Sequence, residues 1–286
     1  MGSVRPLLLL GHGTRDPLGR EAFFGFARHL GTLPPDRPVE PCFLELCPPG
    51  IVEAVDRCVA RGATELVVVP LLLFAARHTK YDIPQELDRA RARHPGLRIR
   101  YGQPLGLAPE MLAIARDRVE EALGALPRSE TALVLLGRGS SDPDANGDVC
   151  KMARLLYEGS GLAAAEACYV GITYPRLAEG LRRVLRLGLR AVVVLPWLLF
   201  PGVLLGRVHE VASQFQRLHP EVEVRVAREI GADRRLRELV LRREAEALRG
   251  EVRMNCELCK FRMAAGPESP GEDDPASYHR RAWQVP

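Results

Sequence analysis

The stretch GATELVVVPLLLF at residues 62–74 returns 126 residues later as GLRAVVVLPWLLF at residues 188–200, with seven of the thirteen positions identical. In both copies the central residues are apolar without interruption, so a strand built from them would be buried on both faces. Such runs are typical of parallel strands that are covered by helices on both sides. The pair therefore predicts two equivalent parallel strands, one in each half of the chain.

Two further matches extend the repeat. The motif GHGTRDP at residues 11–17 returns as GRGSSDP at 137–143, again 126 residues later, and the segment near His94 returns loosely near His219. Matches in the same order at nearly one spacing indicate an internal duplication. We expect one lobe at residues 1–126 and a second at 131–250. A segment at 251–286 follows, with a Cys-x-x-Cys pair and a tail rich in Pro, Gly, Glu and Asp, a composition typical of flexible chain.

Short apolar runs alternate with longer amphipathic ones in both copies. The first copy predicts strands at 6–10, 39–46, 65–70 and 97–101, and helices at 18–30, 49–61, 79–93 and 109–123. The second copy predicts strands near 132–136, 167–172, 191–195 and 222–226. Because alternating strands and helices form right-handed crossovers, the expected fold class is α/β, with two tandem lobes that each hold a parallel sheet flanked by helices.

The composition excludes several classes of protein. Of the 286 residues, 47% are hydrophobic and 27% charged, as in globular domains. A net charge of +4 and an aromatic content of 6% argue against a nucleic-acid partner. The apolar stretch at 191–206 contains prolines and glycines and is shorter than the roughly 20 residues of a membrane span. The apolar run at 7–10 is also too short for a signal peptide, and the seven scattered cysteines do not resemble a disulfide framework. We therefore expect a reduced, cytoplasmic protein.

Three polar side chains of the first copy follow its strands. In open parallel sheets, ligands bind beyond the carboxyl ends of the strands. His12 follows the first strand between two glycines, Glu45 interrupts the apolar end of the second, and His78 comes shortly after the third. Two imidazoles and a carboxylate suit a first-row divalent metal, and a neutral imidazole can also accept a proton. The alternative is three unrelated residues: a turn histidine, a partly buried glutamate and a helix-capping histidine.

The second copy serves as an internal control for these residues. At the repeat offset, His12 becomes Arg138, His78 becomes Leu204, and Glu45 aligns with Gly171 or Ile172. The scaffold motifs persist while the three candidate ligands are lost. We infer that the first lobe is catalytic and that the second has become a wall or lid.

GHGTRDP, FLEL and VVVPLLLFAARHT, followed by a degenerate second copy, resemble the sirohydrochlorin chelatase family, most of all the long, duplicated cobaltochelatases of anaerobic cobalamin biosynthesis. The likeness covers about residues 5–250 and is strongest in the first half. It implies chelatase-type lobes with the tetrapyrrole in the cleft between them. It also implies that the residues matching the family ligands, His12, Glu45 and His78, bind the incoming metal and assist its insertion.

The resemblance implies insertion of Co²⁺ into sirohydrochlorin. The two histidines would hold the metal and one would accept a pyrrole proton, while Glu45 would neutralise charge and relay protons. No ATP is implied, because the P-loop spacing is absent. Sirohydrochlorin carries several carboxylates, so the cations beside the motifs are candidate substrate contacts. These cations are Arg15, Arg77, Lys80 and Arg138. A solvated surface role is an equal alternative for each of the four.

The pair Cys256 and Cys259 lies beyond the duplicated core. Long cobaltochelatases can carry such a segment with an Fe–S cluster, so the resemblance makes a cluster possible here. A [4Fe–4S] cluster usually needs four thiolates, and two are offered. The protein would then be a cluster-bridged homodimer, or a monomer with other ligands; an unoccupied thiol pair is the alternative.

Other functions use the same residues. Iron insertion for sirohaem and nickel insertion are close alternatives, because ligand chemistry does not separate Co²⁺, Fe²⁺ and Ni²⁺. A non-catalytic carrier of a tetrapyrrole or metal is an alternative of another class. A sugar- or nucleotide-binding module is a third, but no glycine-rich phosphate fingerprint supports it. The role of His209, one turn past Leu204, stays open between a compensating ligand and a helix face.

Overall fold

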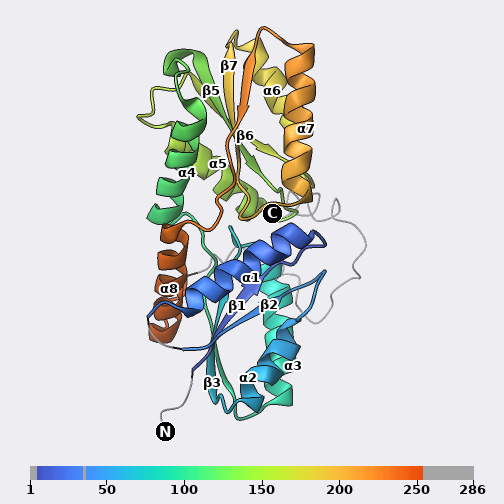
Figure 1. The fold of residues 1–286 in the computed structure, drawn as a ribbon, viewed down its shortest axis with the longest axis vertical. Coiled ribbons are helices and arrows are strands. Elements are labelled where there is room, and N and C mark those ends of the chain that lie inside the picture. Colours follow the sequence, from blue (N-terminus) through green and yellow to red (C-terminus); the bar gives the residue numbers. More distant parts are fainter. Residues whose placement is uncertain (1–4, 35–36, 254–286) are drawn as a thin grey trace, which may run out of the picture.

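The computed structural model describes residues 5–34 and 37–253, which form two α/β lobes (Figure 1). Each lobe has a parallel four-stranded sheet, and the strand orders are β2-β1-β3-β4 and β6-β5-β7-β8. The predicted fold class is therefore confirmed. The strands are β1 (Leu7–Gly11), β2 (Val39–Phe43), β3 (Glu65–Pro70), β4 (Arg98–Tyr101), β5 (Thr131–Gly137), β6 (Ala164–Tyr169), β7 (Ala191–Pro196) and β8 (Glu223–Val226).

The helices begin where the repeated motifs predict a cap. Asp16 and Asp142 are the N-caps of α1 and α5, and each is followed by proline at the first helical position. An Asp side chain accepts a hydrogen bond from the free N–H groups of the first turn, and proline there gives up only an N–H that has no helical partner. The helices are α1 (Pro17–Gly31), α2 (Ile51–Ala60), α3 (Ile83–Arg93), α4 (Pro109–Leu123), α5 (Pro143–Tyr157), α6 (Leu177–Arg186), α7 (Val203–Leu218) and α8 (Arg234–Arg249), with short turns η1 (His78–Asp82) and η2 (Arg128–Glu130).

The last helix of each copy crosses to the other lobe. Helix α4 packs on β7 and β8 of the second sheet, and α8 packs on β3 and β4 of the first (Figure 1). The repeat units at 1–126 and 131–250 are therefore units of sequence, while each packed lobe borrows one helix from the other unit. This exchange ties the lobes together, because α1 and α5 cover only part of the face of each sheet on which the exchanged helix also packs.

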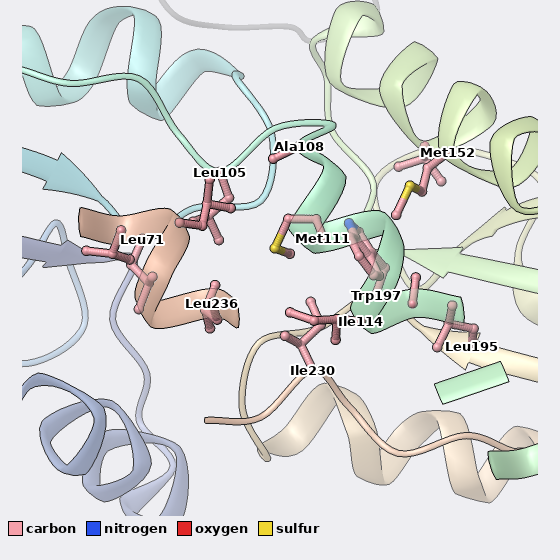
Figure 2. Packing of buried hydrophobic residues seen from close by; sticks show 14 of the residues in the cluster. Leu71, Leu105, Ala108, Met111, Ile114, Met152, Leu195, Trp197, Ile230 and Leu236 are labelled. Atoms are coloured by element: carbon pink, nitrogen blue, oxygen red, sulfur yellow. The ribbon is translucent and has the colours of Figure 1, made fainter. Parts of the chain in front are cut away.

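One hydrophobic core runs through both lobes. Figure 2 shows Leu71 from the first lobe, Trp197 from the second, Met111 of α4 and Leu236 of α8 within this cluster. Two further clusters fill the outer faces of the sheets. Because interiors are packed as densely as organic crystals, a shared core holds the lobes in one relative position.

Most elements agree with the sequence-based expectation to within two residues, and three differ in a way that has a physical reason. Strand β2 ends at Phe43 rather than at residue 46, because the chain turns at Glu45, whose carbonyl accepts a hydrogen bond from Cys47 N. Strand β6 covers Ala164–Tyr169 rather than 167–172; its first residues are half-buried on an edge strand and so lack a strong apolar pattern. The helix expected at 79–93 begins as the π-helical turn η1.

None of the helices within the described ranges is both long enough and apolar enough to cross a membrane.

Candidate functional site

A cavity of about 610 Å³ lies between the lobes. Its walls include both copies of the glycine-containing motif, with His12 on one side and Arg138 on the other, and also Arg77 and His78 after β3. These segments follow the carboxyl ends of β1, β3 and β5, where open parallel sheets bind ligands. The duplication thus places its two equivalent loops around one shared space.

Glycine at position 13 allows the loop that carries His12 to lie against the turn that carries Glu45. Gly13 has a φ of 104°, and a Cβ placed there would lie 1.7 Å from the carbonyl oxygen of Glu45. The backbones are also joined directly, since Glu45 N donates to the carbonyl of His12 at 3.0 Å. The residue at position 13 must therefore be glycine for the two candidate ligands to be neighbours.

The structure brings together the three candidate ligands of the first copy. One ligand atom from each of His12, Glu45 and His78 lies within 4.8 Å of the others. The imidazole Nε2 of His12 is 3.5 Å from Oε1 of Glu45, and the two imidazole rings have centroids 4.9 Å apart. The side chains are 22%, 46% and 29% exposed, respectively. They form a donor set that is open to the cavity and of the type that binds first-row divalent metals.

Hydrogen bonds orient the two imidazoles. Nδ1 of His78 lies 2.8 Å from Oδ2 of Asp82, and because a carboxylate only accepts, the imidazole N–H donates. Nδ1 of His12 lies 3.3 Å from the carbonyl of Gly13 in the same way. Both rings then keep Nε2 unprotonated, with its lone pair on the side away from the orienting bond, which is the arrangement usual for histidines that bind metals. In this structure the lone pair on Nε2 of His12 accepts a hydrogen bond from Arg138. Asp82 was not among the residues predicted from the sequence, although its position four residues after His78 is a usable signal.

The environment keeps His12 neutral. Burial is the main cause that lowers the pKa of His12 from 6.5 to about 4; the neighbouring Arg138 and His78 act in the same direction, and Glu45 opposes them. A neutral imidazole has a lone pair for a metal, so this residue is ready to act as a ligand at pH 7.

Arg138 reaches across the cavity to the residue that it replaces in the repeat. Its Nη1 lies 2.9 Å from Nε2 of His12 and donates to it. In the described part of the chain no ion pair engages Arg138, and burial lowers its pKa without removing its charge. The second lobe thus presents a cation to the metal-type donor set of the first.

The other three candidate cations differ in their availability. Lys80 is only 1% exposed, and its Nζ pairs with Asp142 at 2.9 Å and Asp144 at 2.8 Å, so the expectation that it contacts substrate is wrong. Its charge is used to join the lobes. Arg77 lines the cavity and lies 3.3 Å from Asp82, whereas Arg15 is exposed and is not part of the cavity wall.

Three other sequence features lie elsewhere. Cys256 and Cys259, the predicted cluster ligands, are outside the described residues. His209 is exposed on α7 and does not line the cavity, which agrees with a helix-face role.

Comparisons with known proteins identify the family and the fold. The family CbiX matches residues 6–122 and 132–247, which correspond to the two copies. The chain is 39% identical over 91% of its length to a sirohydrochlorin cobaltochelatase of Priestia megaterium, covering 85% of that protein. It is 34% identical over 76% of its length to a sirohydrochlorin ferrochelatase of Bacillus subtilis, covering 82% of that protein. The chain also resembles a solved structure, the sirohydrochlorin chelatase SirB from Bacillus subtilis subspecies spizizenii in complex with cobalt. The two superpose with a TM-score of 0.73 at 30% sequence identity, and the match covers 86% of this chain and 96% of that one.

Proposed function

This chain belongs to the CbiX family, and from that premise we propose that it is a sirohydrochlorin chelatase that inserts Co²⁺ without ATP. The observation that carries the proposal is the convergence of His12, Glu45 and His78 on the wall of a cavity between two lobes. Metal insertion needs donors that hold a divalent ion, a base for the ring protons and room for a flat macrocycle. The three donor side chains on the wall of a cavity of about 610 Å³ support the proposal.

The donor set holds the incoming metal. Nε2 of His12 and Nε2 of His78 bind the ion, and Glu45 contributes an oxygen that offsets its charge. The metal is a substrate here, so the site must also release it. Partly exposed ligands, with Glu45 at 46%, serve that purpose because the ring can approach the ion from the cavity.

Proton transfer accompanies the exchange. The ring gives up two pyrrole N–H protons as the divalent ion enters, so the net charge of its centre does not change. When the metal leaves His78, its Nε2 can accept one proton, and the Asp82 carboxylate 2.8 Å from Nδ1 stabilises the resulting imidazolium. Glu45 takes the second proton and passes it to water. His12, whose pKa is lowered to about 4 mainly by burial, stays neutral at pH 7 and so keeps its role as a ligand.

The second lobe recognises the substrate. Arg138 contacts an imidazole rather than a carboxylate, so a substrate carboxylate can take over its guanidinium in a charge-assisted hydrogen bond. Arg77, on the opposite wall, is the second candidate for such a contact. We assign catalysis to the repeat unit of residues 1–126 and substrate enclosure to the repeat unit of residues 131–250.

Cobalt is the preferred metal because the cobaltochelatase of Priestia megaterium matches 91% of the chain and because a Cys-x-x-Cys pair resembles the one found in long cobaltochelatases. Iron is the second candidate, since a ferrochelatase also matches 76% of the chain. The test combines the purified protein with sirohydrochlorin and Co²⁺, Fe²⁺ or Ni²⁺ separately and follows the absorption spectrum. A higher kcat/KM for Fe²⁺ would overturn the cobalt assignment. An unchanged spectrum with every metal would favour a carrier.

A cluster at Cys256 and Cys259 is a separate part of the proposal. We expect protein purified without oxygen to contain iron and sulfide and to sediment as a dimer if two chains share the cluster. Colourless, iron-free protein would contradict it.

A further inference from the structure

The same strained turn occurs at the cavity in both lobes. Cys47 N donates to the carbonyl of Glu45 at 2.9 Å around Leu46, and Thr173 N donates to the carbonyl of Gly171 at 2.7 Å around Ile172. A hydrogen bond across one residue defines a γ-turn. The central residues have φ values of 68° and 65°, which is the rarer and less stable form of this turn.

Neither Leu46 nor Ile172 is a residue that such a turn favours. Positive φ is normal for glycine and tolerated by asparagine, but it is costly for a branched side chain such as isoleucine. The conformation is held from outside, because Gly139 packs so closely that a Cβ there would lie 2.0 Å from the carbonyl of Gly171, as Gly13 does at Glu45. Strained residues held in this way cluster at functional sites.

The two side chains are also unusually exposed. Leu46 is 48% and Ile172 is 57% exposed, although both are large and apolar. Both line the cavity that contains His12 and His78, one from each lobe. Two apolar residues therefore have an unfavourable backbone conformation, and neither of their side chains is buried in the core.

We propose that Leu46 and Ile172 are substrate-binding residues that contact the flat, conjugated ring of the tetrapyrrole from the two lobes. This proposal rests on the proposed function. It assigns the apolar ring to these two side chains and the carboxylates at the edge of the ring to Arg138 and Arg77. A flat ring with charged edges requires both kinds of contact. Removing its apolar faces from water lowers the free energy, whereas each carboxylate that leaves water needs a hydrogen-bond donor or a cation in its place. The strained turns hold the apolar tips in the cavity rather than against the lobe that carries them.

The test replaces Ile172, because its lobe carries none of the metal ligands. Ile172→Gly removes the side chain and suits the positive φ, so the melting temperature should stay equal or rise. We expect the affinity for metal-free sirohydrochlorin, measured by absorption titration of the full chain, to fall about tenfold through the lost apolar contact. The affinity for Co²⁺ alone, measured by calorimetry, should not change. Leu46→Gly should weaken ring binding in the same way.

Two controls separate ring contact from a general effect. Ile172→Leu keeps an apolar side chain and should retain the affinity for the ring. Leu218→Ala removes a side chain that is 69% exposed but lies outside the cavity wall, and it should change nothing. If the wild-type protein binds sirohydrochlorin and both glycine variants bind it equally well, the inference is wrong. If the wild-type protein does not bind sirohydrochlorin at all, the proposed function itself fails.

Discussion

Replacement of Lys80 by methionine should break the buried ion pairs that join the two lobes. Lys80 lies on η1, two residues after His78, and its Nζ contacts Asp142 and Asp144 of the second lobe. Burial by itself would lower the pKa of Lys80, but the hydrogen bonds that its ammonium donates to Asp144 and Asp142 outweigh burial and raise the pKa, so the side chain is charged at pH 7. Methionine has nearly the same length but lacks the ammonium group that contacts both carboxylates.

The expected loss follows from the burial of the three groups. Removing one partner of a buried ion pair costs about 3–5 kcal/mol, because the other charge stays buried and unpaired. Asp142 is 5% exposed and keeps a hydrogen bond from Asp144 N, while Asp144 is 33% exposed and can be solvated. The cost should therefore lie near the lower limit, at about 3 kcal/mol. For a chain of this size that corresponds to a fall in Tm of roughly 6–12 °C.

The assay is urea and thermal unfolding, followed by circular dichroism, with calorimetric titration of Co²⁺ on the same samples. Arg89→Met is the matched control: Arg89 pairs with Glu86 on the same lobe but is 70% exposed, so its loss should cost under about 0.5 kcal/mol. Lys80→Met should also weaken Co²⁺ binding, since η1 carries His78. The reasoning is refuted if Lys80→Met costs no more than Arg89→Met.

Three further substitutions test the site and its supports. His78→Ala should abolish metal insertion and leave the circular dichroism spectrum unchanged; near-normal turnover would contradict the ligand assignment. Gly13→Ala should cost more than about 2 kcal/mol and lower Co²⁺ affinity, because its Cβ would displace the turn that carries Glu45; wild-type values for both would argue against this. The hydrogen bond from Arg235 lowers the pKa of Asp233 from 3.8 to about 2, although burial opposes it. Asp233 therefore adds stability that is present above about pH 4 and is lost as the pH falls towards 2. Asp233→Asn should cost about 1–2 kcal/mol at pH 7, and its unfolding curve should converge with that of the wild type near pH 2.

Much of the fold was predictable because the repeat and the apolar runs are local signals. The strand β3 matches its predicted bounds, and the motifs ending in Asp-Pro mark the starts of α1 and α5. The resemblance to sirohydrochlorin chelatases was confirmed by the comparisons. The proximity of residues that directly follow the strands was also predictable, since the carboxyl ends of parallel strands lie at one edge of a sheet. This is why His12, Glu45 and His78 could be named together before their distances were known.

The exchange of α4 and α8 was not predictable in the same way. The apolar face of a helix shows that it must pack, but not on which of two similar sheets. Because the copies are related by sequence, the apolar face of α4 suits either sheet, and only the assembled core selects β7 over β3. The strained turns at Leu46 and Ile172 were not predicted, because glycine or asparagine is the usual sequence signal of a positive φ and neither residue is present at these positions.

The chain alone therefore determined the duplication, the α/β class and the positions of the candidate ligands, because these depend on periodicity and on where strands end. Tertiary structure decided which charged groups are free to act. Lys80 and Arg138 both stand next to the repeated motifs, yet one is buried between two aspartates that follow it by more than 60 residues, and the other donates to His12 across the cavity. The partner of a charged side chain is set by residues distant in sequence, so neighbourhood in the chain does not reveal whether that charge is already paired.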